Sequence, residues 1–115
     1  MYHRWAHEQF KANAPFFTCE CVLDELAFIV GDARLGMKMV ARGDLVLDFS
    51  LADHIEEVLA LLEKYSDLQM DLADACLVRM TELTDRCKVW TVDATDFKVY
   101  RRHGRYVIPC EFPGE

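Results

Sequence analysis

The sequence lacks a long apolar run, an internal repeat and a low-complexity stretch. No segment approaches the roughly 20 apolar residues that a membrane helix needs. The first residues, Met1 to Trp5, do not contain the hydrophobic region of a secretion signal. These features predict a cytoplasmic protein that does not enter a membrane.

Basic residues are outnumbered, with 13 Lys and Arg against 20 Asp and Glu and a net charge of −7. This balance argues against the broad electropositive surface of a typical DNA-binding module. It does not exclude nucleic-acid processing, because bound cations reverse the charge of an acidic site.

The cysteines lack the spacing of a structural zinc site. There are five of them, an odd number, and Cys19 and Cys21 have no second pair at ligand spacing. We therefore interpret them as reduced thiols, buried as small apolar side chains.

The sequence is rich in apolar residues, which make up 52% of its 115 positions, so the chain can bury the core of one domain over residues 1–115. Apolar runs predict strands, and longer periodic patterns predict helices. The expected strands are Phe16–Thr18, Leu45–Phe49, Val89–Val92 and Tyr106–Pro109. The expected helices are Tyr2–Lys11, Val22–Val30, Asp32–Ala41, Ser50–Tyr65 and Asp71–Leu83. This alternation predicts an α/β fold with a mostly parallel sheet.

Three helices carry more specific expectations. Residues 22–30 are nearly all apolar and predict a largely buried helix that ends at Gly31, and the next helix should stop near Gly43. In the helix after Ser50, one face is expected to be buried against the core. That face consists of Ile55, Val58, Leu59 and Leu62.

Three groups of acidic residues stand out: Glu25 in an apolar helix, Asp71 and Asp74 on one helix face, and Asp93 and Asp96 directly after a strand. Ligands of parallel sheets gather at the carboxyl ends of strands. Carboxylates are the ligands that Mg²⁺ and Mn²⁺ prefer, so these groups predict a divalent metal site.

Each group also has a structural explanation. Asp71 is a candidate helix N-cap, with Asp74 favourable in the first turn. Glu25 is a candidate ion-pair partner at a helix edge, and Asp93 and Asp96 are candidate turn residues. The order of the three groups along the chain is a more specific indication of function than any one group by itself.

That order resembles the PIN-domain nucleases, and VapC-type toxins in particular. The similarity lies in Met70-Asp-Leu-Ala-Asp-Ala-Cys-Leu-Val-Arg79 and Val89-Trp-Thr-Val-Asp-Ala-Thr-Asp-Phe97. Upstream, Thr18-Cys-Glu-Cys-Val-Leu-Asp-Glu-Leu26 is similar to the family's second motif. The resemblance implies a PIN-like (Rossmann-like) sheet flanked by helices.

In that family an acidic quartet binds Mg²⁺ or Mn²⁺ and cleaves RNA. By position, the resemblance assigns the catalytic and metal-binding roles to Glu25, Asp74 and Asp93. It assigns Asp96 as an accessory metal ligand, and Asp71 as an acid found in part of the family. Glu20 is an alternative to Glu25, although the spacing to Thr18 favours Glu25.

The chain departs from the family pattern at its start. PIN domains begin with an apolar strand that ends in the first metal-binding aspartate, and no such strand precedes the helix expected at Tyr2. We expect an N-terminally truncated domain that lacks its central first strand, has weak or no hydrolytic activity, and pairs as a homodimer. A misassigned start codon is the other explanation.

The leading functional hypothesis is a VapC-type endoribonuclease neutralised by a VapB-like antitoxin. A basic cluster could contact RNA phosphates, or form a solvated loop. Its arginines are Arg101, Arg102 and Arg105. The main alternative is a non-catalytic PIN remnant that serves as a binding or dimerisation module. A phosphatase-like or other carboxylate metal enzyme is a third possibility, which the residues after Asp74 do not favour.

Overall fold

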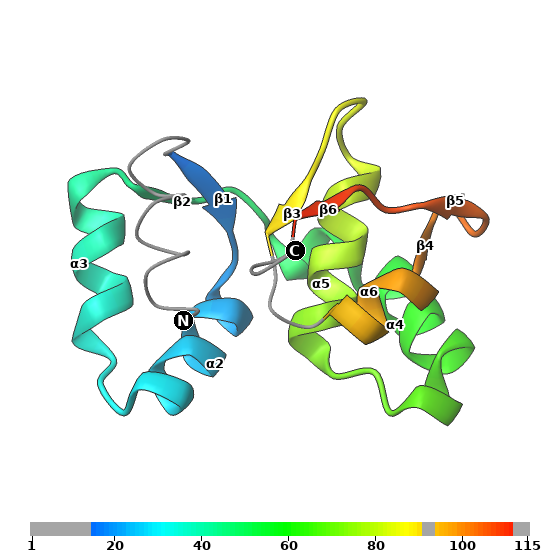
Figure 1. Cartoon of the computed structure of the whole chain (residues 1–115), viewed down its shortest axis with the longest axis horizontal. Helices are drawn as coiled ribbons and strands as arrows, with labels where there is room; N and C mark the ends of the chain where they lie inside the picture. Colours follow the sequence, from blue (N-terminus) through cyan, green and yellow to red (C-terminus); the bar gives the residue numbers. More distant parts are fainter. Residues whose placement is uncertain (1–14, 91–93, 112–115) are drawn as a thin grey trace. The chain divides into compact units, whose positions relative to one another are not determined.

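Contacts divide the chain into two units, which meet in sequence at Ser50 and Leu51. The computed structural model describes residues 15–90 and 94–111 (Figure 1). The helix expected at Tyr2–Lys11 lies outside these residues. None of the described helices is long and apolar enough to span a membrane.

The N-terminal unit is a β-α-α-β arrangement. Its elements are β1 (Phe16–Thr18), α2 (Glu20–Val30), α3 (Arg34–Arg42) and β2 (Leu45–Leu47). The two strands pair in parallel, with Phe16 opposite Leu45 and Thr18 opposite Leu47. A parallel pair needs a crossover connection between its strands, and the two helices provide it.

The helix ends in this unit are as expected, since Gly31 and Gly43 close α2 and α3 in the left-handed conformation. Gly36 lets α3 approach α2 closely, because a Cβ at this position would lie 3.1 Å from Cδ2 of Leu23. The expected burial of α2 is wrong. None of its residues is buried, and Phe28 is 89% exposed. A helix that is apolar all round needs neighbours on every side, whereas α2 packs mainly against α3.

The C-terminal unit packs two helices against short strands. The elements are η1 (Leu51–His54), α4 (Ile55–Lys64), η2 (Ser66–Leu68), α5 (Leu72–Glu82), β3 (Val89–Trp90), α6 (Ala94–Val99), β4 (Arg101–Arg102), β5 (Tyr106–Val107) and β6 (Cys110–Glu111). β3 pairs with β6 in parallel, and β4 with β5 in an antiparallel hairpin. A mixed α/β chain with parallel strand pairs is therefore confirmed, while a single PIN-like sheet stays a prediction.

The helix expected from Ser50 begins differently. Its first turn is the 3₁₀ helix η1, and α4 starts at Ile55 without a side-chain cap. The predicted apolar face is also partly wrong, because Ile55 and Leu59 are exposed while Val58 and Leu61 are buried. Apolar side chains cover more of the surface of α4 than its packing against α5 can bury. Part of its apolar face therefore stays exposed.

Two strands are shorter than expected. β2 ends at Leu47 rather than Phe49, and β5 ends at Val107. Pro109 separates β5 from β6, and its carbonyl accepts a hydrogen bond from the amide of Val89. Proline cannot donate to a strand ladder, so the chain here changes partner from β4 to β3. Of the strand expected at Val89–Val92, the part after Trp90 lies outside the described residues.

Candidate functional site

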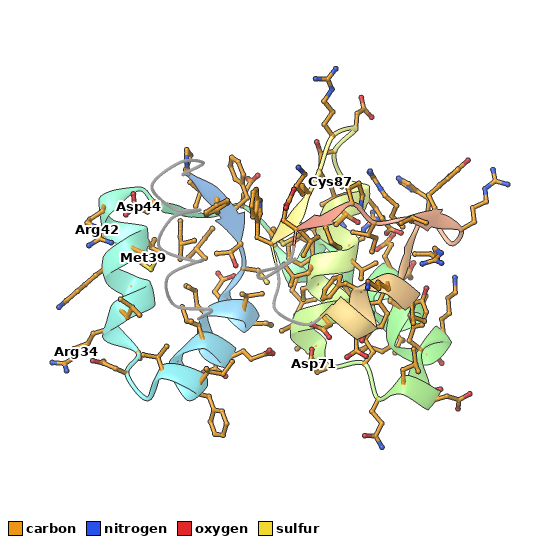
Figure 2. The ribbon with its side chains drawn as sticks, viewed as in Figure 1. Arg34, Met39, Arg42, Asp44, Asp71 and Cys87 are labelled. Carbon is orange, nitrogen blue, oxygen red and sulfur yellow. The ribbon has the colours of Figure 1, made fainter. Side chains whose placement is uncertain are left out.

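The start of α5 brings two of the predicted acidic residues together, Asp71, which is labelled in Figure 2, and Asp74. Asp71 is the N-cap of the helix, and its Oδ1 accepts a hydrogen bond from the backbone N–H of Asp74 at 2.7 Å. An N-cap acceptor satisfies one of the amide groups that a helix start leaves unpaired. The capping role foreseen for Asp71 is therefore confirmed, and it is compatible with a second role in a metal site.

Tyr100 lies next to these acids. Its side chain is 1% exposed, and its hydroxyl donates a hydrogen bond to Oδ2 of Asp74 at 3.3 Å. Burial raises the pKa of Tyr100, and so do the negative charges of Asp74, Asp96 and Asp71 and the hydrogen bond to Asp74. Asp74 therefore contacts this hydroxyl, and the charges of two further predicted metal ligands, Asp96 and Asp71, disfavour its ionisation.

Aromatic neighbours fix the position of the Tyr100 ring. Tyr65 and Phe97 pack edge-on against it, with ring centroids at 5.0 Å and 5.2 Å. The Tyr65 hydroxyl accepts a hydrogen bond from the backbone N–H of Arg101 at 2.9 Å, which ties α4 to the residue after Tyr100. The reasoning from sequence missed Tyr100. A usable signal was its position four residues after Asp96, a spacing that places two side chains on one helix face.

The remaining predicted ligands have no determined position relative to these acids. Glu25 is exposed on α2 of the N-terminal unit, and its alternative Glu20 is exposed in the first turn of the same helix. Asp93 lies outside the described residues. In the part of the chain that is described, no three His, Cys, Asp or Glu side chains form a group that could hold a metal ion.

Two of the three predicted RNA-binding arginines make structural contacts. Nη1 of Arg101 donates to the carbonyls of Lys98, Val99 and Tyr100, at 2.7 Å, 3.1 Å and 3.1 Å. These bonds satisfy carbonyl groups at the end of α6. Nη2 of Arg102 donates to the carbonyl of Thr84 at 2.5 Å.

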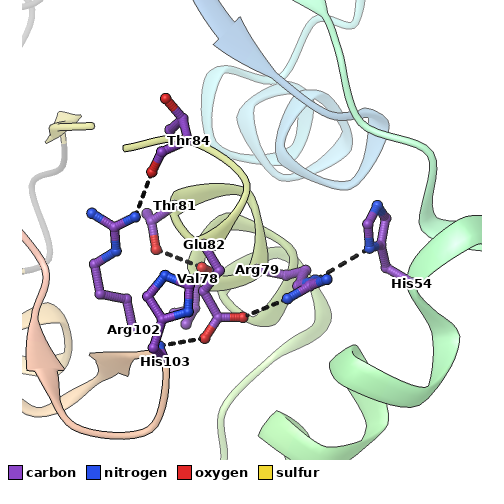
Figure 3. A network of polar contacts seen from close by, with 8 residues as sticks. All are labelled: His54, Val78, Arg79, Thr81, Glu82, Thr84, Arg102 and His103. Carbon is purple, nitrogen blue, oxygen red and sulfur yellow. Dashed lines mark hydrogen bonds and ion pairs between the residues drawn. The ribbon is translucent and has the colours of Figure 1, made fainter. Parts of the chain in front are cut away.

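A polar network that the sequence did not reveal lies on another side of α5 (Figure 3). Arg79 donates from Nε to Nδ1 of His54 at 3.2 Å, and its Nη1 pairs with Oε1 of Glu82 at 3.1 Å. The second oxygen of Glu82 accepts the backbone N–H of His103 at 2.6 Å. The network therefore joins η1, α5 and the β4–β5 hairpin.

All five cysteines are free, as the sequence predicts. Cys19 and Cys76 are buried, and the other three are partly buried. Burial, and then the nearby Cys87, raise the pKa of the Cys110 thiol to about 11.

The resemblance to PIN domains has no support from comparisons with known proteins. No protein-family model, no curated protein and no solved structure matches the chain. The family assignment therefore rests on the sequence motifs alone.

Proposed function

We propose that the chain is a PIN-type nucleic-acid-binding protein and acts as a Mg²⁺- or Mn²⁺-dependent endoribonuclease of the VapC kind. One observation supports this most directly. The Tyr100 hydroxyl bonds to Asp74, and the charge of Asp96, 22 positions further along the sequence, raises the pKa of the same hydroxyl. The family pattern pairs these two acids in one metal site. Asp71 acts on the same hydroxyl.

The donor set fits a hard divalent cation, since it consists of carboxylate oxygens. Under this proposal Asp74 and Asp93 bind the ion with Glu25, and Asp96 and Asp71 assist. A bound divalent ion would activate water for attack and stabilise charge on the phosphodiester. Tyr100 keeps the Asp74 carboxylate in one orientation, and Asp71 keeps Asp74 at the first turn of α5.

The proposal includes the partners that VapC-type toxins have. These are an RNA substrate, a small VapB-like antitoxin and a second copy of the chain. An antitoxin segment would occupy the site formed by the acidic residues around Tyr100 and so exclude the RNA. An equimolar amount of antitoxin should therefore protect the RNA from cleavage.

A second candidate function is a binding or dimerisation module without catalysis. The end of α2 favours it, because Phe28, Ile29 and Val30 are consecutive apolar side chains that are all exposed. Exposed apolar patches on soluble proteins commonly mark contact surfaces.

The two functions are separated by metal and RNA measurements on the purified chain. We expect Mn²⁺ to bind in calorimetry and to start cleavage of a labelled single-stranded RNA, with EDTA stopping it. Asp74→Asn should abolish both, whereas Asp67→Asn, which changes an exposed acid on η2, should leave both intact. The second function would be supported by two results together: the chain does not bind Mn²⁺, and it forms a dimer that the Phe28→Asp substitution dissociates.

A further inference from the structure

Four side chains lie at the turn between β4 and β5, and we name them the hairpin tip: His103 and Arg105 of the turn, Tyr106 of β5, and Lys64 at the end of α4. His103 and Gly104 both have positive φ, at 52° and 78°, and the amide of Arg105 bonds to the carbonyl of Arg102 at 3.2 Å. Arg102 pairs with Tyr106, which leaves a three-residue loop. Positive φ at both central residues of a turn belongs to the type I′ geometry, whose twist matches that of a hairpin. The loop is therefore a defined turn, and its residues are exposed to solvent.

The hairpin tip carries positive charge in an acidic protein. From Phe97 to Cys110 the sequence has four of its 13 Lys and Arg residues and no Asp or Glu. Lys64 adds a further cation, because its Nζ donates to the carbonyl of Gly104 at 3.0 Å. The acid bonded to this turn is Glu82, whose charge is offset by Arg79 and by the His103 amide.

Arg105 differs from the other two arginines of this segment. Arg101 and Arg102 bind backbone carbonyls, whereas the exposed guanidinium of Arg105 has no ion-pair partner within the described ranges. It lies 5.1 Å from the centroid of the Tyr106 ring, as a cation–π pair. Such pairs are weak at exposed sites, so Arg105 can leave the ring for a stronger anionic partner at little cost.

Tyr106 offers an exposed aromatic surface beside these cations. Its side chain is 52% exposed, and the His103 ring lies edge-on at 6.4 Å. Surface cations next to exposed rings are the combination with which proteins hold single-stranded nucleic acid, since phosphates meet the cations and unpaired bases stack on the rings. Duplex RNA keeps its bases stacked internally and offers no such partner.

We propose that the hairpin tip binds single-stranded RNA, with Tyr106 stacking on a base and with Arg105 and Lys64 contacting phosphates. The identity of the polyanion as RNA rests on the proposed function. The binding itself does not need a metal or the acidic residues around Tyr100. An acidic protein segment is the competing occupant, and the experiment must separate it from RNA.

The test is fluorescence anisotropy of the full chain with a labelled 12-nucleotide oligouridylate, in EDTA so that nothing is cleaved. We expect Tyr106→Ala to weaken binding at least about fivefold, because a stacked base is lost, and Tyr106→Phe to bind as the unmodified chain does. Phe17→Ala, which removes another exposed ring, is the matched control and should have no effect. Circular dichroism checks that each variant is folded.

A salt series tests the phosphate contacts. Arg105→Ala should lower the slope of log affinity against log salt by about 0.7, the value for one phosphate on a single strand. Lys38→Ala on α3 should leave the slope unchanged.

Three results would overturn the proposal: equal affinity for Tyr106→Ala and the unmodified chain, equal binding of duplex RNA, or displacement of the oligonucleotide by polyglutamate of equal charge. The last would identify an acidic protein segment as the occupant. Asp74→Asn separates the two proposals, because it should lose cleavage and keep this binding. A chain that binds through Tyr106 but never cleaves would refute the nuclease and leave the hairpin tip standing.

Discussion

The Tyr100 hydroxyl donates to Oδ2 of Asp74 at 3.3 Å and joins a buried ring after α6 to a carboxylate in the first turn of α5. The ring is held edge-on by Tyr65 and Phe97. A hydrogen bond from a rigid donor restricts the orientations of a carboxylate. In metal sites, groups of this kind tune the affinity of the ligand that they contact.

Tyr100→Phe is expected to weaken Mn²⁺ binding by about 10- to 100-fold, the range for loss of an outer-shell hydrogen bond. The ring and its packing remain, so the free energy of unfolding should fall by only about 0.5–1.5 kcal/mol. Calorimetry and urea denaturation measure the two effects. Tyr65→Phe is the control, since it removes the hydroxyl that accepts from Arg101 and does not touch Asp74. An equal loss of metal affinity in both variants would contradict the positioning role.

Asp71 is expected to have separable capping and charge roles. Asp71→Ala removes the acceptor for the Asp74 amide and should lower the free energy of unfolding by about 0.5–2 kcal/mol. Asp71→Asn keeps a good N-cap without the charge, so its stability should stay close to that of the unmodified chain. If Asp71 assists the metal, Asp71→Asn still weakens Mn²⁺ binding. Stability loss of the same size in both variants would show that the cap is not the stabilising feature.

The ends of α2 and α3 were predictable from local chemistry, and helix burial was not. Gly31 and Gly43 end α2 and α3 because a left-handed C-cap is a local requirement. Which side of a helix is buried depends on its tertiary neighbours. The apolar spacing in α4 predicted that Ile55 and Leu59 are buried, but both are exposed. In the folded helix, which packs against α5, Val58 and Leu61 are buried.

The candidate site was predictable where it depends on helical spacing. Asp71 and Asp74 share one end of α5, as their separation of three residues requires. Tyr100 was not found, because the sequence does not show which group a tyrosine hydroxyl bonds to after folding. Nor does the sequence indicate that Arg102 binds the carbonyl of Thr84, since folding brings that carbonyl near from 18 positions away.

Arg79 is expected to contribute more to stability than an exposed arginine does. Its side chain is 20% exposed and that of Glu82 is 9% exposed, whereas the Arg34–Asp32 pair is 80% and 41% exposed. Arg79→Met should lower the free energy of unfolding by about 1.5–3 kcal/mol, because a mostly buried carboxylate loses a charged donor. Arg34→Met should cost at most about 1 kcal/mol. Denaturation in urea compares them, and similar losses would mean that the network of Figure 3 is not stabilising.

Cys110 is expected to react slowly with alkylating reagents until the pH is well above the usual range for a thiol. Burial and the nearby Cys87 raise its pKa from 9.0 to about 11, and the thiol donates to the carbonyl of Ile108 at 3.3 Å. Only the thiolate is nucleophilic, so the rate for folded Cys110 should reach half its maximum near pH 11. The same residue in urea should do so near pH 9.

The same shift makes stability depend on pH. Between about pH 9 and pH 11 the unfolded chain releases this proton while the folded chain keeps it. The stabilisation is therefore fully present below pH 9 and is lost as the pH rises through 11. Cys110→Ala removes the effect, so the stability difference between this variant and the unmodified chain should shift in favour of the variant over that interval. The alkylation rate of Cys110 is measured at a series of pH values by iodoacetamide labelling followed by peptide mass spectrometry. A midpoint for Cys110 that is the same with and without urea would show that its surroundings in β6 do not disfavour the thiolate.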